Sequence, residues 1–414
     1  MKINIMRLAE QHSYSLKVLG ICLFGWTIAN MDQSFFGYAI PSIMEEFDVD
    51  LVFIGFILTG AFLVSVVSVV VSGFLADKYG RRALFAICLS MSALLVGLHS
   101  IAPSVEAMAA LRIAAFAIST GLVPITNAMI VETAPAKYRG IFGGIMQCGY
   151  PLGWFLASMI AIPLMGNYGW RSIFLPAFAV IPIAILIARS LPESNKHIAS
   201  SAKENENTLS FIDRLQIIFS REYRLRAILG WTAFLGYGGA YAGTAFYFPT
   251  FFQEVRGYTL EDSTALVGLS YGVGVLGYLG ASWVGEFVTT RRNTVVLWTW
   301  VGALAVCFLI WPDNGYAYDM ALFSIMAMFF YGTSAVLTIF VSELFPTNIR
   351  ATAVGAVAGM GINLGFAIYP VIVANLVGLH GWKIAFTLAI VPSLFAAGLA
   401  TLFQPNLKSG TEIQ

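Results

Sequence analysis

The sequence predicts an all-α membrane protein with twelve transmembrane helices in two pseudo-symmetric six-helix bundles. Three observations predict this fold class: an apolar composition, twelve apolar segments of spanning length and an internal repeat. Of the 414 residues, 58% are hydrophobic and 11% are charged, which leaves too few charges to cover a water-soluble globule of this size. The lipid bilayer is therefore an expected partner. The formal net charge of +1 indicates neither nucleic acid nor an acidic protein as a further partner.

Each predicted span is an apolar segment, because a transmembrane helix needs roughly 20 mostly apolar residues. Short polar or Gly/Pro breaks separate the segments. The first segment is too long for a signal-peptide core, so we expect a retained helix. In chain order, the segments cover residues 17–41, 51–76, 83–101, 105–131, 140–165, 172–190, 225–250, 262–286, 293–312, 318–342, 351–378 and 383–404.

Basic residues predict the orientation, since Lys and Arg favour cytoplasmic loops near helix ends. With both termini cytoplasmic, nineteen Lys and Arg residues fall inside, and only Arg171, Arg256 and Lys383 fall outside. The remaining basic residue, Arg112, lies within a span. We therefore expect a multi-pass protein of the cell membrane with both termini in the cytoplasm.

The two halves of the chain share an internal repeat. "ETAPAKYRG" at 132–140 recurs as "ELFPTNIRA" at 343–351, and "GWRSIF", starting at Gly169, recurs as "GWKIAF", starting at Gly381. A weaker similarity between the stretches around these prolines aligns Pro41 with Pro249. Parallel repeats of this kind place a substrate site between them, near the middle of the membrane.

A polar segment divides the repeats. Residues 191–223 form the only long polar stretch, and its later part has apolar residues at helical spacing, as in a short helix at the membrane surface. The predicted organisation is an N-terminal bundle over 1–190, a cytoplasmic linker over 191–223 and a C-terminal bundle over 224–414.

A loop motif between the second and third spans suggests a family. "GFLADKYGRR", residues 73–82, resembles the loop signature of the major facilitator superfamily. The twelve spans, the repeat and the linker extend this resemblance over the whole chain. The corresponding stretch of the second half, "SWVGEFVTTRR" at 282–292, keeps an acid and two arginines but differs in spacing. The resemblance implies a transporter fold and a monomer, and it names no substrate.

Charged residues at the predicted cytoplasmic helix ends suggest a latch. Carboxylates and guanidiniums there can join helix ends when that side is closed and part when it opens. The alternative is that they only set topology. Glycines permit the tight turn and close packing. The candidate latch residues are Gly73, Asp77, Gly80, Arg81, Arg82, Glu132, Arg139, Glu286, Glu343 and Arg350.

Two ionisable residues, Asp32 and Arg112, lie well inside predicted spans, where a charge is costly unless it is paired or faces a cavity. Both fall roughly 12 to 14 Å below the outer membrane face at 1.5 Å per residue, so they share a depth. We expect Arg112 to bind a substrate carboxylate and Asp32 to carry the coupled proton. The alternative is a permanent ion pair that braces the two helices.

The remaining substrate-binding candidates are polar or aromatic. Tyrosines beside a guanidinium suit a ligand with an apolar ring and an acidic end. The alternative for each single tyrosine is that it is a packing residue or an interfacial anchor. The candidates are Asn30, Gln33, Tyr38, Gln147, Tyr150, Tyr237, Tyr241, Tyr331 and Asn363.

The expected function is proton-coupled symport, that is uptake of a small aromatic or sugar-type carboxylate by alternating access. "RIAAFAISTGLVPITNAMIVE" at 112–132 and "NMDQSFFGYAIP" at 30–41 are similar to helices of the aromatic acid:proton symporters. A proton-coupled sugar porter, a drug or metabolite efflux antiporter and a nutrient sensor remain alternatives.

An enzyme is not expected, because the sequence has no phosphate loop, no G-x-S-x-G and no metal-like His/Cys spacing. No catalytic residue, cofactor or metal ion is predicted. The histidines His12, His99, His197 and His380 are expected near membrane edges or in the linker, where solvent reaches them.

Overall fold

A computed structural model describes residues 2–134, 139–190, 211–346 and 349–406. Over these residues the chain is helical and contains no strand, as predicted. Eleven helices in the described part of the chain are long and apolar enough to cross a membrane. The predicted seventh span, 225–250, is not among them, although it is helical. Its glycines and tyrosines lower its hydropathy.

The first bundle contains every helix before the predicted linker. Several predicted spans are divided into two helices by short irregular turns. The elements are α1 (Lys2–Phe47), α2 (Leu51–Tyr79), α3 (Arg81–Leu98), η1 (His99–Ile101), α4 (Val105–Thr120), α5 (Leu122–Thr133), α6 (Arg139–Gln147), α7 (Gly149–Tyr168), η3 (Trp170–Phe174) and α8 (Ala177–Ser190).

The second bundle follows a short helix, α10 (Phe211–Ile218), which lies in the predicted linker; residues 191–210 of that linker are outside the described residues. Two elements of this bundle, η4 and η6, are π-helical. The elements are α11 (Arg224–Ala245), α12 (Phe248–Arg256), α13 (Leu260–Trp283), η4 (Val284–Val288), α14 (Arg291–Ile310), α15 (Tyr316–Phe329), η5 (Tyr331–Thr333), α16 (Ser334–Glu343), α17 (Arg350–Ala353), η6 (Val354–Gly359), α18 (Met360–His380), α19 (Trp382–Ala389) and α20 (Val391–Leu402).

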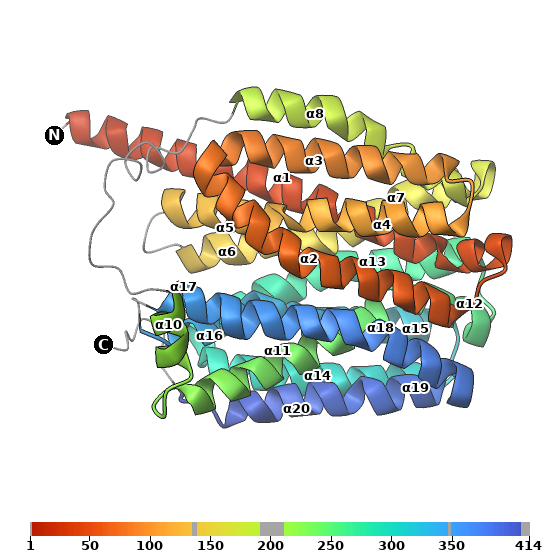
Figure 1. The fold of residues 1–414 in the computed structure, drawn as a ribbon. Helices are drawn as coiled ribbons and strands as arrows, with labels where there is room; N and C mark the ends of the chain where they lie inside the picture. Colours follow the sequence, from red (N-terminus) through yellow and green to blue (C-terminus); the bar gives the residue numbers. More distant parts are fainter. Residues whose placement is uncertain (1, 135–138, 191–210, 347–348, 407–414) are drawn as a thin grey trace.

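The two bundles lie side by side with their helices running in the same general direction (Figure 1). Helix α1 begins and α20 ends at the end of the molecule that holds α10, which we call the linker end. Helices α12 and α19 lie at the opposite end, the far end. Across the boundary between the bundles, α2 packs on α18 and α7 packs on α13.

Prolines explain why several spans are divided. A proline inside a helix offers no N–H to the carbonyl one turn before it, and its ring crowds that carbonyl. Four prolines each lie in the first turn of a helix that follows one of the breaks between helices: Pro124, Pro151, Pro249 and Pro392. The breaks before α5, α7 and α12 lie in spans that carry candidate site residues.

The repeat predicted from the sequence appears as a pair of matching hydrogen bonds at the far end. In the first bundle, Trp170 Nε1 donates to Glu46 Oε2 at 2.8 Å. In the second bundle, Trp382 Nε1 donates to Glu254 Oε2 at 2.7 Å. The first bond joins α1 to η3, which precedes α8, and the second joins α12 to α19, which precedes α20. We call these two bonds the Trp–Glu clamps.

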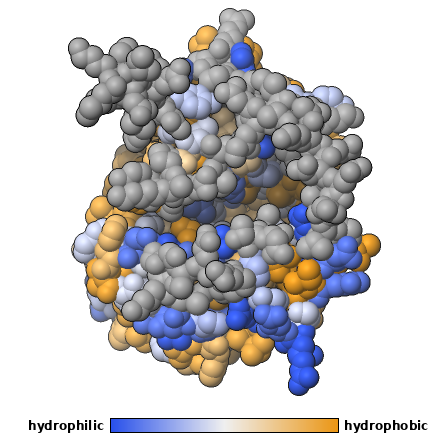
Figure 2. All heavy atoms as spheres, turned by 90° about the vertical axis from the view of Figure 1, so that its left-hand side faces the viewer, coloured by the Kyte–Doolittle hydropathy of each residue, from blue (hydrophilic) through white to orange (hydrophobic). Residues whose placement is uncertain are grey.

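The bundles meet closely near the far end. The hydroxyl of Thr59 on α2 donates to the carbonyl of Ala367 on α18 at 2.6 Å, and a Cβ on Gly268 of α13 would lie only 1.8 Å from the Oγ atom of Ser158 on α7. At the linker end, by contrast, Figure 2 shows a hollow between the bundles. The far side is therefore closed and the linker side is open.

Gly268→Ala should weaken the closure of the far end, because the new methyl group overlaps Ser158 and forces α7 and α13 apart. We expect a loss of about 1–3 kcal/mol of stability, typical of overpacking, measured as a lower melting temperature in detergent. Gly280→Ala on the same helix is the matched control, since its Cβ would lie 4.0 Å from Trp298. Equal melting temperatures for the two variants would contradict this account.

Candidate functional site

Arg112 and Asp32 meet in the interior of the first bundle. Arg112 lies on α4 and is 2% exposed, and Asp32 lies on α1 and is 5% exposed. The guanidinium NH1 group of Arg112 is 3.5 Å from the backbone carbonyl oxygen of Asp32. The prediction that the two residues share a depth is therefore confirmed.

The side chains of these two residues are not joined to each other. Among the described residues, neither Oδ2 of Asp32 nor the Nε and NH2 groups of Arg112 have a hydrogen-bond partner. Buried polar atoms without partners are rare in proteins and need an explanation. A permanent brace would show a direct carboxylate–guanidinium contact, so this geometry favours groups that await a ligand or a proton.

Aromatic rings surround the guanidinium instead. The guanidinium carbon of Arg112 lies 4.6 Å from the ring centre of Phe36, 5.4 Å from that of Phe116 and 5.7 Å from that of Phe246. A cation over an aromatic face is attracted by the ring quadrupole, more strongly when water is excluded. Phe246 belongs to the second bundle, so the arginine contacts both halves of the molecule.

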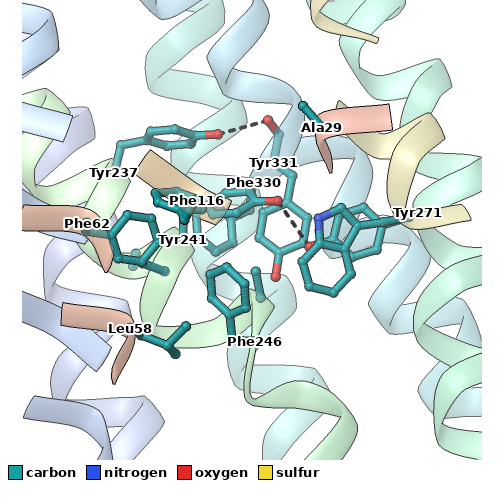
Figure 3. Close-up of a cluster of buried hydrophobic side chains, with 14 of the residues drawn as sticks. Ala29, Leu58, Phe62, Phe116, Tyr237, Tyr241, Phe246, Tyr271, Phe330 and Tyr331 are labelled. Carbon is teal, nitrogen blue, oxygen red and sulfur yellow. Dashed lines mark hydrogen bonds between the residues drawn. The ribbon is translucent and has the colours of Figure 1, made fainter. Parts of the chain in front are cut away.

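A layer of aromatic side chains fills the boundary between the bundles (Figure 3), and Phe116 and Phe246 of this layer contact Arg112. The hydroxyls of Tyr241 and Tyr271 share a hydrogen bond of 3.2 Å, and that of Tyr237 donates to the Tyr331 carbonyl at 3.0 Å. The ring of Tyr150, from the first bundle, meets Tyr241 edge-on at 5.1 Å. Tyr150 is half-buried, whereas its neighbour Tyr241 is buried.

The structure brings some predicted substrate residues together and ties others to the backbone. Tyr150, Tyr237, Tyr241 and Tyr331 gather in the aromatic layer, whereas Tyr38 is buried within the first bundle and donates to the Trp154 carbonyl at 3.0 Å. The amides among the candidates make local contacts or remain half-buried: Asn30 bonds Trp26, Gln33 bonds Asn30, Asn363 bonds Gly359, and Gln147 is half-buried.

Trp154 and Phe246 belong to this site, and sequence reasoning missed both. Trp154 is fully buried, stacks on Tyr271 at 4.9 Å and meets Phe246 edge-on at 5.8 Å. The sequence holds one signal for it: Trp154 lies four residues after Tyr150, which places both on the same face of a helix. No pattern in the sequence distinguishes Phe246 from its many aromatic neighbours.

The expectation for His99 is wrong. The residue is only 1% exposed, and its ring stacks on Phe174 at 5.1 Å. Its Nδ1 atom lies 2.9 Å from the Leu95 carbonyl, a contact in which Nδ1 carries the proton. The helical segment ends at Ile101, where the predicted span ends, and the histidine stays inside the bundle because Phe36 and Phe174 cover its ring.

The candidate latch is described mainly in the second bundle. Arg291 at the start of α14 pairs with both Glu286 of η4 and Glu343 of α16. Glu343 thus pairs with Arg291 and not with Arg350, which donates to the Phe345 carbonyl at 3.3 Å. These contacts tie three helix ends of one bundle together while the linker end is open.

The first-bundle part of the candidate latch is only partly described. Gly80 adopts φ of 92° at the predicted tight turn, a region that favours glycine, and Gly73, Arg81 and Arg82 are half-buried. The side chains of Asp77, Glu132 and Arg139 lie outside the described residues.

With this geometry in place, the chain can be compared with known proteins. It matches the family described as the Major Facilitator Superfamily over residues 22–360. The chain belongs to this superfamily. Members of the major facilitator superfamily that resemble it are transporters and not enzymes, and the eleven apolar helices agree with a multi-pass protein of the cell membrane.

Several superfamily relatives resemble this chain over nearly its full length. The niacin transporter NiaP of Acinetobacter baylyi is 22% identical, with 94% of each chain covered. The 4-hydroxybenzoate transporter PcaK of the same organism is 25% identical, covering 96% of this chain and 93% of the relative. The gentisate transporter of Corynebacterium glutamicum is 25% identical, covering 93% and 85%.

A solved structure confirms the fold. The crystal structure of a bacterial homologue of the human lysosomal transporter Spinster, in an inward-facing and unoccupied conformation, matches with a TM-score of 0.66. The match covers 94% of this chain and 95% of the other at 16% sequence identity, so it supports the architecture alone.

Arg291→Gln should destabilise the linker end, because Glu286 and Glu343 would then face each other without their shared cation. We expect a loss of about 1–2 kcal/mol for these partly exposed pairs, and partial recovery when Glu343→Gln is added. Thermal unfolding in detergent measures both effects. Arg292→Gln is the control, since Arg292 bonds Asn293 and the carbonyls of Leu402 and Gln404; an equal loss there would contradict a specific role for Arg291.

Proposed function

We propose that this protein is a secondary active transporter that takes up a small organic acid, aromatic or sugar-type, together with protons. The observation that carries the proposal is the buried guanidinium of Arg112, whose Nε and NH2 groups have no partner among the described residues, beside Asp32, whose Oδ2 atom likewise has none. Relatives named as transporters of niacin, 4-hydroxybenzoate and gentisate support it.

The substrate carboxylate binds Arg112 in this scheme. A guanidinium presents parallel N–H donors that match the two oxygens of a carboxylate. Its Nε and NH2 groups have no partner among the described residues, so two donors on the same guanidinium are available together. A neutral sugar or a hydrophobic cation gives this group no charge partner, which disfavours the sugar porter and the drug antiporter.

The proton is carried by Asp32. In the empty site the neighbouring guanidinium favours the ionised carboxylate, whereas burial favours the neutral carboxyl. When a substrate carboxylate neutralises Arg112, burial dominates and Asp32 takes up a proton. Substrate and proton therefore bind together, and the loaded site carries no excess charge across the membrane interior.

In this proposal, transport proceeds by alternating access between the two ends of the molecule. We assign the linker end, with both chain termini, to the cytoplasm. We assign α11 with α12 to the seventh span, which completes the predicted twelve. The described conformation, closed at the far end and hollow at the linker end, is then the inward-facing state. Residues 1–190 and 224–414 move as two bodies joined by the linker 191–223, and the protein acts as a monomer.

The proposed coupling predicts a specific defect in Asp32→Asn. The variant should bind the acid, but it should fail to accumulate the acid in proteoliposomes whose outside is more acidic than their inside. The reason is that the amide takes up no proton. Exchange of labelled for unlabelled acid at equal pH should persist, since it needs no net proton movement. Accumulation at the wild-type level by the variant would overturn proton coupling through Asp32.

A binding panel tests the substrate class. Purified protein at about pH 6 should be stabilised by aromatic or sugar acids, by about 2.7 kcal/mol at a ligand concentration 100 times the dissociation constant. Arg112→Gln should remove the effect, and Arg112→Lys should retain only part of it because the second donor is lost. Stabilisation by neutral sugars or hydrophobic cations instead would contradict the carboxylate role of Arg112.

A further inference from the structure

Helix α10 has an apolar stripe that no described part of the chain covers. Ile212 is 65% exposed, and Phe219, which directly follows the helix, is 53% exposed. The Phe219 N–H donates to the Leu215 carbonyl at 3.0 Å, so the last helical turn includes this residue. Ile212 and Phe219 are seven residues apart, which places them on one side of a helix. The other side carries the fully buried Ile218 and packs on α17, so the stripe points away from the second bundle.

The orientation of α10 differs from that of the spanning helices. Figure 1 shows α10 crosswise to the helices of the two bundles at the linker end. A helix perpendicular to spanning helices lies parallel to the membrane surface. The turn after α10 leads into α11, on which Leu225 and Ile228 are exposed. Apolar side chains exposed on a spanning helix face the acyl chains of the bilayer, so α10 lies just outside the hydrocarbon region, at the level of the lipid headgroups.

Two exposed arginines lie between the stripe and the apolar surface of α11. Neither Arg221 nor Arg224 pairs with an acid in the described part of the chain. Residues 211–226 contain four arginines and two acids, Asp213 and Glu222, so this segment carries a net charge of +2. A guanidinium binds phosphate oxygens through two parallel N–H donors. The charge and the geometry therefore fit an anionic phosphate group.

The corner between α10 and α11, residues 212–226, is fixed to the rest of the second bundle. The ring of Tyr223 packs on that of Phe345 with 6.1 Å between the ring centres. The guanidinium of Arg226 donates to the Leu344 carbonyl at 3.0 Å, and the Nε2 atom of Gln404 donates to the Arg226 carbonyl at 2.8 Å. These contacts join the corner to the ends of α16 and α20. A surface that is already ordered loses little entropy when a ligand binds.

We propose that the α10–α11 corner binds anionic phospholipid headgroups of the leaflet at the linker end, which the proposed function assigns to the cytoplasm. Arg221 and Arg224 contact the lipid phosphates, and Ile212 and Phe219 enter the boundary between headgroups and acyl chains. Amphipathic helices bind bilayers in this way, through buried apolar area together with attraction to anionic lipids. The contact lies outside the substrate site, so the inference does not depend on which acid is transported.

The test compares lipid compositions. The full-length protein is placed in nanodiscs of phosphatidylcholine with increasing fractions of phosphatidylglycerol, and its melting temperature is measured. We expect the melting temperature to rise with the phosphatidylglycerol fraction, because a ligand that binds the folded state stabilises it, and the rise to shrink at high salt, which screens the charges. Equal melting temperatures in all compositions would overturn the proposal. An equal rise with soluble glycerol 1-phosphate would also overturn it, since the ligand would then be a free phosphate.

Arg221→Gln and Arg224→Gln should each weaken the apparent affinity for phosphatidylglycerol roughly fivefold, the effect of one basic residue near an anionic surface. Lysine at either position should keep most of the affinity, because it keeps the charge. Lys17→Gln is the matched control, since Lys17 is an exposed cation on α1, and it should leave the affinity nearly unchanged. An equal loss in the control would show only a general attraction of basic residues and would contradict a site at the corner.

Phe219→Ser tests the apolar stripe. Removing this ring should weaken the affinity for phosphatidylglycerol several-fold, whereas Phe287→Ser, which removes an exposed ring from η4, should leave it unchanged. An unchanged affinity in Phe219→Ser would show that the stripe does not enter the bilayer and would contradict the proposed arrangement. The melting temperature of every variant in pure phosphatidylcholine should equal that of the wild type, which separates a loss of lipid binding from a loss of folding.

Discussion

The guanidinium of Arg112 is a permanent charge inside a membrane protein, and much of the surrounding structure compensates for it. Placing an arginine at the centre of a spanning helix costs about 2.5–3.5 kcal/mol on insertion scales. The Asp32 carbonyl and the faces of Phe36, Phe116 and Phe246 offset part of this cost. The compensation is incomplete, because the Nε and NH2 groups of the guanidinium lack partners among the described residues. These two donors are available to a ligand.

Close helix packing brings aromatic residues to the boundary between the bundles. A Cβ on Gly239 of α11 would lie 2.3 Å from the ring of Tyr369 on α18, so only glycine permits this approach. Such packing fixes Tyr237 and Tyr241 of the same helix against the centre of the molecule. The glycine-rich sequence that lowers the hydropathy of α11 is thus the property that lets it line the site.

The fold was predictable from the sequence because the lengths of the apolar segments indicate spanning helices, and the repeated motifs indicate two related bundles. The depth shared by Asp32 and Arg112 followed from helix geometry alone. The sequence did not reveal that Arg112 would be covered by rings, nor that Trp154 would stack on Tyr271 of the other bundle, because both depend on contacts between segments far apart in the chain. His99 was misjudged for a related reason, since its environment is set by Phe174 and not by its sequence neighbours.

The Trp–Glu clamps fasten α1 to η3 in the first bundle and α12 to α19 in the second, both at the far end. At the linker end of the second bundle, the backbone of η4 and η6 is π-helical, and this wider winding often marks functional positions in helices. Although two of its segments are π-helical, the second bundle is fastened at both tips, by a Trp–Glu bond at the far end and by the ion pairs of Arg291 at the linker end. It should therefore turn as one block during a transport cycle, with deformation confined to the contacts between the bundles.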